Sequence, residues 1–337
     1  MSLSTTPSSR EQQRLDWARD ATGNPALGLE RASVDAGFRS YWRTTGITPS
    51  LIVMDSPPGK DNVQPWLRIR TLLLEGGVRV PDVLAQDVEQ GFLLLEDLGV
   101  DTYLHRIDAD NADAMFDAAF AQLLRVQAIP VPEGFPEYDE PSLLRELRLF
   151  DEWFLGTHLG VQLSAEETER LFEVYRLLIE RALAQPQVFV HRDFMPRNLM
   201  PCGDGTAVID FQDAVRGPVA YDAICLFKDA FLSWPEERVA GWLAKYHSLA
   251  VEAGIPVPAL AHFRDDADLI GIHRHLKVIG IFARLNHRDG KPRYVADAPR
   301  FLAYLDAVLP RHPELQALAD VLDTHVRPAL LAQTAAA

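Results

Sequence analysis

Three oxygen-bearing side chains, Asp193, Asn198 and Asp210, follow one another closely in the middle of the chain. Asp193 stands in a loop after an apolar strand, and the other two flank a predicted hairpin with arms at 199–200 and 207–209. Because an antiparallel hairpin brings its two ends together, we expect Asn198 and Asp210 to meet beside Asp193. Mg²⁺ prefers hard oxygen ligands and usually keeps several waters, so few protein ligands are required. A carboxylate that accepts a hydroxyl proton and two magnesium ligands together suit phosphoryl transfer.

A purely structural role is the alternative interpretation of these residues, because Asp side chains in loops often satisfy nearby backbone donors. The spacing favours chemistry, since each of the three residues stands at the end of an apolar strand. The order H-R-D-x-x-x-x-N followed by Asp-Phe is also the catalytic signature of protein kinases. His191 and Arg192 within it are predicted to brace the loop rather than take part in the reaction.

The composition is that of an ordinary globular protein, with 47% hydrophobic and 24% charged residues among 337. This length suits two lobes that share a cleft. The formal net charge of -15 disfavours binding to nucleic acid or to an anionic membrane. Two cysteines without metal-ligand spacing, and the lack of a signal-like or bilayer-spanning apolar run, favour a reduced, cytoplasmic protein. We expect a monomer whose partners are small molecules.

The first hundred residues are rich in strands and contain two candidate nucleotide contacts. Between Ser33 and Phe38 a small-residue turn joins two strands and would place backbone N–H groups over phosphates, although a plain hairpin turn fits as well. A buried strand then runs into Glu96-Asp97-Leu98-Gly99, whose backbone would pair with an adenine edge; an acidic loop between domains is the alternative. The predicted nucleotide-contacting residues here are Ser33, Asp35, Ala36, Gly37, Phe38, Arg43, Glu96 and Leu98.

After about residue 101 the hydrophobic periodicity becomes that of helices. Two helices are also predicted before that point, over 10–21 and 62–75, and Asp61 or Asn62 would cap the second. The fold class is therefore α+β, with a strand-rich lobe over 1–98 and a larger, mainly helical lobe over 99–337. The helices predicted in the second lobe cover 109–129, 142–155, 164–184, 219–232, 236–253, 260–288, 298–309 and 314–325.

A strand-rich lobe, an acidic connector and a helical lobe that carries HRDFMPRN and IDF resemble the two-lobe, protein-kinase-like fold. No Ala-Pro-Glu element follows Asp210, which argues against a protein kinase, whereas G-P-V-A-Y-D at 217–222 resembles the aminoglycoside and choline phosphotransferase group. Within that group, four segments are similar to the anomeric kinases of N-acetylmuramate and N-acetylglucosamine in bacterial cell-wall recycling: 35–43, 53–58, 209–214 and 277–284.

That resemblance implies an enzyme that transfers the γ-phosphate of ATP to the C1 hydroxyl of the sugar and gives a sugar 1-phosphate in peptidoglycan recycling. We predict that Asp193 orients the attacking hydroxyl and accepts its proton, while Asn198 and Asp210 hold Mg²⁺ across the β- and γ-phosphates. Asp222 matches the aspartate that braces the catalytic loop of this group through backbone N–H groups. A stabilising negative charge at a helix N-terminus is a second role for Asp222.

Other polar residues are candidates for contacts with the acceptor. Arg197 would meet the transferring phosphate or a substrate carboxylate, and a surface salt bridge is the equal alternative. The predicted sugar-facing residues are Gln212, Asp213, His273, Lys277 and Arg284, and His275 belongs to the same helical cluster as the last three. For the residues of that helix, a solvated face is the competing interpretation.

One part of the kinase pattern is missing. The strand at 51–54, Leu-Ile-Val-Met, should carry the lysine that binds the ATP phosphates, yet it contains no Lys or Arg. Arg39, Arg43 or Lys60 would replace that lysine, or magnesium would carry more of the charge. Two other functions stay open: transfer to another small acceptor such as an aminoglycoside, choline or an amino alcohol, and a non-catalytic nucleotide-binding module.

Overall fold

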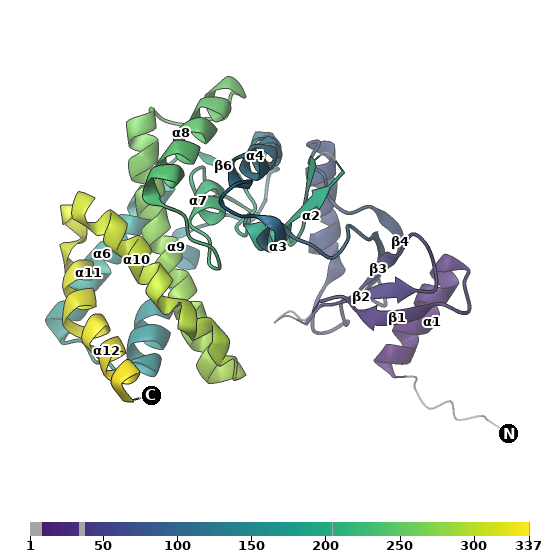
Figure 1. Ribbon diagram of the computed structural model, residues 1–337, viewed down its shortest axis with the longest axis horizontal. Coiled ribbons are helices and arrows are strands. Elements are labelled where there is room, and N and C mark those ends of the chain that lie inside the picture. Colours follow the sequence, from purple (N-terminus) through teal and green to yellow (C-terminus); the bar gives the residue numbers. More distant parts are fainter. Residues whose placement is uncertain (1–8, 34–37, 204, 337) are drawn as a thin grey trace. The chain divides into compact units, whose positions relative to one another are not determined.

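The computed structural model describes residues 9–33, 38–203 and 205–336, and Figure 1 traces their helices and strands. By its internal contacts the chain divides into two compact units. The first reaches to Gln122 and includes Arg197–Gln212; the second contains Leu123–Pro196 and the chain from Asp213 onward. The predicted lobe boundary between residues 98 and 99 stays a prediction. The α+β class is confirmed, because strands build the first unit and helices dominate the second.

An antiparallel sheet of five strands forms the framework of the first unit, in the order β1-β2-β3-β5-β4. The interior strands β3 and β5 are the most apolar and the most buried, as expected for strands covered on both faces. Register places Val53 between Trp42 on one neighbouring strand and Leu94 on the other. The five strands are β1 (Gly28–Arg31), β2 (Ser40–Thr45), β3 (Leu51–Asp55), β4 (Val83–Asp87) and β5 (Phe92–Glu96).

Two helices of the first unit confirm the predictions made for them. Helix α1 (Arg10–Thr22) is capped by Ser9 and packs Ala18 against the sheet core. Helix α2 (Val63–Glu75) starts at its cap Asn62, whose side chain accepts a hydrogen bond from the N–H of Gln64. Its buried residues recur at helical spacing and are Val63, Trp66, Ile69 and Leu73.

The predicted hairpin is also confirmed, as β7 (Leu199–Cys202) paired with β8 (Gly205–Val208). The pairing continues one step past the last strand residues, because the N–H of Ile209 donates to the carbonyl of Asn198 at 3.0 Å. The two ends of the hairpin therefore meet, as the spacing of Asn198 and Asp210 required.

Helices fill the second unit around a two-stranded sheet of β6 (Gln187–Val190) and β9 (Val215–Pro218). A π-helical segment, Phe150–His158, continues α5. In chain order, the helices after α2 are α3 (Tyr103–Arg106), α4 (Ala112–Ala128), α5 (Glu140–Leu149), α6 (Ala165–Ala184), α7 (Tyr221–Phe227), α8 (Glu236–Glu252), α9 (Leu260–Asp289), α10 (Ala298–Val308), α11 (Gln316–Val321) and α12 (Arg327–Ala336). Of these, α3 and the part of α4 up to Gln122 belong to the first unit.

Besides the α-helix predicted over 142–155, which becomes π-helical after Leu149, two helix predictions were wrong in their extent. The helix predicted over 219–232 ends at Phe227, because the carboxylate of Asp229 accepts hydrogen bonds from the N–H groups of Phe231 and Leu232 and turns the chain. The helix predicted over 314–325 is shorter, since α11 gives way to a π-helical segment, Leu322–Val326. Hydrophobic periodicity alone does not reveal either interruption.

Helix α9 is the central element of the second unit and contacts α5, the π-helical segment, α6, α7 and α10. Most of its middle third is buried, including the charged residues Arg274 and Lys277. Among the residues that the structure describes, no helix combines the length and apolar character needed to cross a membrane.

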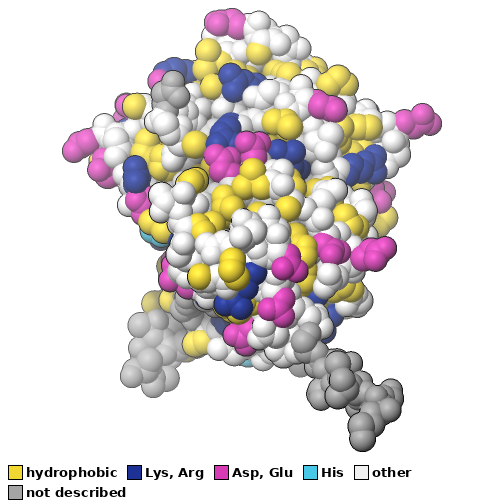
Figure 2. Space-filling view, turned by 90° about the vertical axis from the view of Figure 1, so that its right-hand side faces the viewer, with side chains coloured by type: hydrophobic (Ala, Val, Ile, Leu, Met, Phe, Trp, Pro, Cys, Tyr) yellow, Lys and Arg dark blue, Asp and Glu magenta, His cyan; other side chains and the backbone are white. Residues whose placement is uncertain are grey.

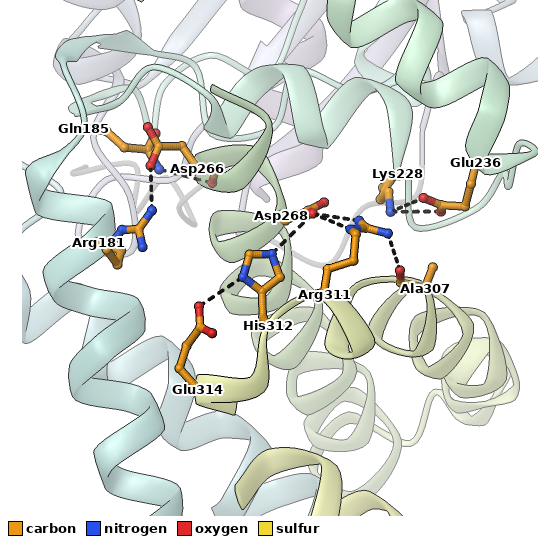
Figure 3. A network of polar contacts seen from close by, with 10 residues as sticks. All are labelled: Arg181, Gln185, Lys228, Glu236, Asp266, Asp268, Ala307, Arg311, His312 and Glu314. Atoms are coloured by element: carbon orange, nitrogen blue, oxygen red, sulfur yellow. Dashed lines mark hydrogen bonds and ion pairs between the residues drawn. The ribbon is translucent and has the colours of Figure 1, made fainter. Parts of the chain in front are cut away.

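Polar contacts tie the first turns of α9 to the C-terminal helices, as Figure 3 shows. Asp268 accepts hydrogen bonds from Arg311 at 2.7 and 3.1 Å, and His312 lies 3.4 Å from the same carboxylate. Two residues earlier, Asp266 pairs with Arg181 of α6 at 3.5 Å. The two arginines are partly exposed, so each of their pairs contributes about 1 kcal/mol or less and orients these helices more than it stabilises them.

The close approach of α9 to the end of α5 predicts that Gly280→Ala destabilises the protein. A Cβ atom at Gly280 would lie 2.4 Å from the backbone carbon and oxygen of Leu149, so one of the helices would have to shift. We expect a loss of about 1–3 kcal/mol in the free energy of unfolding, the usual cost of overpacking, even though alanine favours helices. Urea unfolding followed by circular dichroism measures it.

Gly241→Ala on α8 is the matched control, because a Cβ atom there meets no atom within 4 Å. This second variant should gain about 0.5–1 kcal/mol from helix propensity. Equal gains in both variants would contradict the tight crossing at Gly280.

Candidate active site

A buried aspartate anchors the loop that follows β6. Asp222, in the first turn of α7, accepts hydrogen bonds from the N–H of His191 at 2.7 Å and from the N–H of Arg192 at 3.0 Å. Burial raises the pKa of Asp222 to about 7, although both hydrogen bonds act to lower it. The brace implied for Asp222 is therefore present, and it holds two successive amides just before Asp193.

Asp193 follows this anchored turn and is partly buried. Its N–H donates to Nδ1 of His191 at 3.2 Å, and the buried His191 ring lies edge-on to Phe194. Burial acts to lower the pKa of Lys277 and Arg274, and negative charges that include Asp193 raise both above their ordinary values. Asp193 thus lies in a field of buried cations, and His191 is the brace that the sequence predicts.

The carboxylate of Glu146 on α5 joins the loop to α9. It pairs with the guanidinium of Arg192, accepts a hydrogen bond from the hydroxyl of Tyr138 and lies 3.1 Å from Nζ of Lys277. Lys277 also donates to the hydroxyl of Tyr221 at 3.1 Å. We call these five residues the Glu146 cluster. Burial acts to raise the pKa of Glu146, but the charges of Lys277 and Arg192 hold it at about 2.

Arg192 itself has an unusual backbone, with a φ of 75°. A non-glycine residue in this left-handed region costs free energy and needs support from its surroundings. The two amide bonds to Asp222 and the ion pair with Glu146 supply that support. Arg192 is therefore a brace of the loop, as predicted.

The histidines and the lysine of α9 do not form a solvated face, so that interpretation was wrong for them. His273 and His275 are fully buried, and Lys277 is nearly so. His273 bonds the carbonyl of Leu143 at 3.1 Å, and burial lowers its pKa to about 4, so the ring is neutral at pH 7. His275 stacks on Tyr304 with ring centroids 4.7 Å apart. Arg284 is partly exposed, and burial lowers its pKa below the ordinary value.

In the first unit, the hairpin brings Asn198 and Asp210 together. Nδ2 of Asn198 lies 3.4 Å from Oδ2 of Asp210, and Gln212 donates to Oδ1 of the same carboxylate at 2.8 Å. Asp210 is exposed and has a left-handed φ of 64°, while Phe211 is buried against Trp66 of α2. An amide and a carboxylate side by side are hard oxygen donors of the kind that Mg²⁺ prefers, so the pair fits the predicted metal.

The roles predicted for the remaining residues next to the hairpin stay predictions. Arg197 and Gln212 are partly buried, and Asp213 is exposed. Within the described residues no group of three or more His, Cys, Asp or Glu side chains is arranged to hold a metal, so Asn198 and Asp210 form a two-ligand candidate.

The predicted nucleotide contacts lie in the first unit. Asp35, Ala36 and Gly37 fall outside the described residues; Ser33 is partly buried and Phe38 is 67% exposed. In the connector, the side chain of Glu96 pairs with Arg79, and its N–H donates to the carbonyl of Asp82 at 2.9 Å. Leu98 is partly buried. The adenine contacts predicted for Glu96 and Leu98 stay predictions.

Arg43 has a carboxylate partner that sequence reasoning missed. It donates to both oxygens of Asp97 at 2.6 and 3.0 Å and to the carbonyl of Gly99 at 2.8 Å. Glu146 was missed as well. The available signal was its position within the apolar stripe of α5, between Leu143 and Leu147, where a glutamate needs a partner.

The Glu146 cluster predicts a pH-dependent effect of Glu146→Gln on stability. The pKa of Glu146 is about 2 in the folded protein and ordinarily 4.5, so its charge stabilises the fold fully above pH 4.5 and progressively less as the pH falls towards 2. The shift corresponds to about 3 kcal/mol. We expect the variant to be less stable than the wild type by about that amount at pH 7, and the difference to shrink below pH 4.5.

Urea unfolding at pH 7, 5, 4 and 3 measures this difference. Glu169→Gln is the control, because Glu169 pairs with Arg176 on the exposed side of α6 and its loss should change stability by less than about 1 kcal/mol. A difference between wild type and Glu146→Gln that stays constant down to pH 3 would show that the cluster does not depress the pKa of Glu146.

Comparison with known proteins places this geometry in a family. The model of the phosphotransferase enzyme family matches residues 28–251. The chain is 51% identical over 315 residues to an N-acetylmuramate/N-acetylglucosamine kinase of Pseudomonas putida, with 93% of each chain covered. It is 40% identical over 315 residues to a protein of the same name from Neisseria meningitidis, with 92% of this chain and 94% of the relative covered.

Solved structures agree in fold. An ADP-bound aminoglycoside phosphotransferase matches with a TM-score of 0.59 and 15% identity, over 87% of this chain and 97% of its own. A choline kinase from Streptococcus pneumoniae matches with a TM-score of 0.60 and 15% identity, over 89% of this chain and 100% of its own. The protein-kinase-like fold predicted from the sequence is confirmed. The chain belongs to the phosphotransferase enzyme family.

Proposed function

We propose that this protein is an ATP-dependent kinase that phosphorylates N-acetylmuramate and N-acetylglucosamine at the C1 hydroxyl and gives the sugar 1-phosphate. The observation that carries the proposal is similarity along nearly the whole chain to relatives named as kinases of these two sugars. The anchored Asp193 loop is compatible with that chemistry. We place the reaction in the cytoplasm, in peptidoglycan recycling, and propose that the protein acts as a monomer.

Asp193 is the proposed general base. It accepts the proton of the C1 hydroxyl while the oxygen bonds to the γ-phosphorus of ATP and the bond from that phosphorus to ADP breaks. C1 carries a hemiacetal hydroxyl, and the ring oxygen withdraws electrons from C1, so this proton leaves more readily than that of an ordinary sugar alcohol. One aspartate on a loop held by Asp222 is therefore a sufficient base.

Asn198 and Asp210 are the proposed ligands of Mg²⁺, with the amide oxygen and the carboxylate as donors. Mg²⁺ bound there would neutralise charge on the β- and γ-phosphates. Gln212 donates a hydrogen bond to Oδ1 of Asp210 and holds that oxygen in place. The other oxygen, Oδ2, lies next to the side chain of Asn198.

The other predicted site residues keep proposed roles. The backbone of Ser33–Phe38, Glu96 and Leu98 would contact the nucleotide. Gln212, Asp213, Arg284 and Arg197 would contact the sugar or the transferred phosphate. We propose that His273 and Lys277 influence the sugar site indirectly, by holding α5 in place. His273 bonds the carbonyl of Leu143, and Lys277 pairs with Glu146.

Asp193→Asn tests the base. Asparagine is nearly the same size but cannot take the proton, so turnover should fall by about 10²–10⁴-fold while the affinity for Mg·ATP stays within a few-fold. Coupled measurement of ADP release with each sugar, together with titration calorimetry of Mg·ATP, gives both quantities.

Asp210→Ala is the comparison variant, because loss of a metal ligand should lower turnover and also weaken Mg·ATP binding. Wild-type turnover in Asp193→Asn would remove Asp193 from the reaction, whatever the result for Asp210→Ala.

A methyl glycoside of N-acetylglucosamine tests the reacting atom. It keeps every hydroxyl except that at C1, so we expect it to receive no phosphate, and we expect the product of the free sugar to be non-reducing and acid-labile. Phosphorus NMR of the two reaction mixtures measures this directly.

The same assay with an aminoglycoside, choline and ethanolamine as acceptors tests the alternative substrates. Phosphate on the 6-hydroxyl of the methyl glycoside would defeat the C1 assignment but keep the kinase. Faster transfer to choline or to an aminoglycoside than to either amino sugar would defeat the proposed substrate class.

A further inference from the structure

In a kinase-type fold the third strand carries a lysine that binds the phosphates of ATP. The corresponding strand of this protein has no lysine. Strand β3 reads Leu-Ile-Val-Met-Asp, and alternate residues of a strand face opposite sides of the sheet. Val53 packs with Ala18 in the core on the α1 side, and Asp55 pairs with Arg10 and Arg14 of α1. Ile52 and Met54 therefore face the other side, where the lysine would have been.

A second strand provides cations on that same side. Tyr41 pairs with Met54, and Arg43 pairs with Ile52, so the side chains of 41 and 43 share the face opposite α1. Trp42 points to the other face, where the guanidinium of Arg14 lies 3.6 Å from its ring centroid. Arg39 precedes Tyr41 by two residues. It therefore continues the row formed by residues 43 and 41, towards the end of the sheet where β3 ends at Asp55.

Arg39 reaches the start of α2 and forms an ion pair there. Its Nε and Nη2 donate to the two oxygens of Asp61 at 2.5 and 3.1 Å, and the hydroxyl of Ser56 donates to the same carboxylate at 2.7 Å. Asp61 immediately precedes Asn62, the cap of α2. In kinases the lysine of the third strand similarly pairs with a glutamate of the following helix. The Arg39–Asp61 pair is of the same kind, but it joins the residue before β2, the neighbouring strand, to the residue before the cap of α2.

The charge and exposure of this pair suit a ligand-binding role. The side chains of Arg39 and Asp61 are 17% and 21% exposed, so both are sheltered yet accessible. Burial acts to raise the pKa of Asp61, but the bonds from Arg39 and Ser56 lower it below the ordinary value, so the carboxylate is ionised. Within the described part of the chain, no acceptor pairs with Nη1 of Arg39, and its two N–H groups can serve a ligand.

The other candidate cations are placed less well. Arg43 lies at the opposite end of the row, bound to Asp97 and to the carbonyl of Gly99 in the connector. That end is where the adenine edge would lie. Lys60 stands on an exposed turn. Arg10 is on the α1 face of the sheet.

We propose that Arg39, positioned by Asp61, is the cation that replaces the missing lysine and binds the polyphosphate of the nucleotide. This assignment rests on the proposed function, since it names a residue of the same nucleotide site. Arg39 would contact the phosphates directly, and Asp61 would be a positioning residue that aims the guanidinium.

Nucleotide binding without turnover tests the assignment. Titration calorimetry should compare Mg·ADP with adenosine for the wild type, Arg39→Met and Arg39→Lys. We expect Arg39→Met to weaken Mg·ADP about 10- to 100-fold, the usual effect of losing charge-assisted hydrogen bonds, and to leave adenosine within two-fold. Arg39→Lys should retain part of the affinity for Mg·ADP that Arg39→Met loses, because lysine keeps the charge but not the forked donors.

Arg10→Met is the matched control. It also removes a guanidinium paired with an aspartate, but on the α1 face, where Arg14 still holds Asp55. Its affinity for Mg·ADP should stay within two-fold of the wild type. Thermal unfolding of each variant confirms that it is folded, and Arg39→Gln replaces Arg39→Met if the latter does not fold.

The role of Asp61 is tested by a double-mutant cycle. Asp61→Asn should weaken Mg·ADP by a few-fold in the wild-type background and have no effect on Mg·ADP in the Arg39→Met background, because Asp61 acts only through Arg39. A loss that is equal for adenosine and Mg·ADP, or equal in both backgrounds, would contradict the positioning role.

The outcomes separate this assignment from the proposed function. Unchanged Mg·ADP affinity in folded Arg39→Met overturns the assignment, as does a phosphate-dependent loss in Arg43→Met or Lys60→Met that exceeds the loss in Arg39→Met. If the wild type binds Mg·ADP but phosphorylates neither amino sugar, the proposed function fails. The comparison of Mg·ADP with adenosine still decides the assignment of Arg39 in that case.

Discussion

One buried carboxylate, that of Glu146, determines how the second unit is arranged around the Asp193 loop. It holds Arg192 of the loop and Lys277 of α9, so three elements far apart in the sequence meet at one point. Removing Glu146 would leave the charges of Arg192 and Lys277 without their carboxylate partner, which costs several kcal/mol. The left-handed backbone of Arg192 persists because its side chain and its amide are both held. The loop is therefore shaped before any substrate arrives.

Pairs of arginine and carboxylate recur in the first unit wherever a loop or connector has to be held. Arg43 bonds Asp97, Arg79 bonds Glu96, and Arg39 bonds Asp61. On the face drawn in Figure 2, basic and acidic side chains are correspondingly interspersed, with hydrophobic ones between them. The net charge of -15 thus coexists with cations that are placed individually. In these three pairs each cation is oriented by its own carboxylate.

The sequence was informative where a residue's neighbours are close in the chain. The hairpin and the cap of α2 follow from spacing and periodicity, and the structure confirms them. The brace at Asp222 spans 31 residues, and the family resemblance implied it. It was misleading on α9, where His273 and Lys277 look like a solvated face because their partners Leu143 and Glu146 lie some 130 residues earlier. An ion pair between residues far apart in the sequence does not alter the local hydrophobic pattern, so that pattern does not predict it. The turn at 34–37 lies outside the described residues, so its phosphate contact remains a prediction.

The hairpin of β7 and β8 has a consequence for how this chain can vary in length. Asn198 and Asp210 stand at its open end, where the N–H of Ile209 closes the ladder onto the carbonyl of Asn198. Their separation is thus fixed across the two strands and does not depend on how many residues connect Cys202 to Gly205. Extra residues in that connection would leave both side chains in place, whereas one extra residue in either arm would turn its remaining side chains to the opposite face. The tip is the natural site for an inserted peptide or a spectroscopic label.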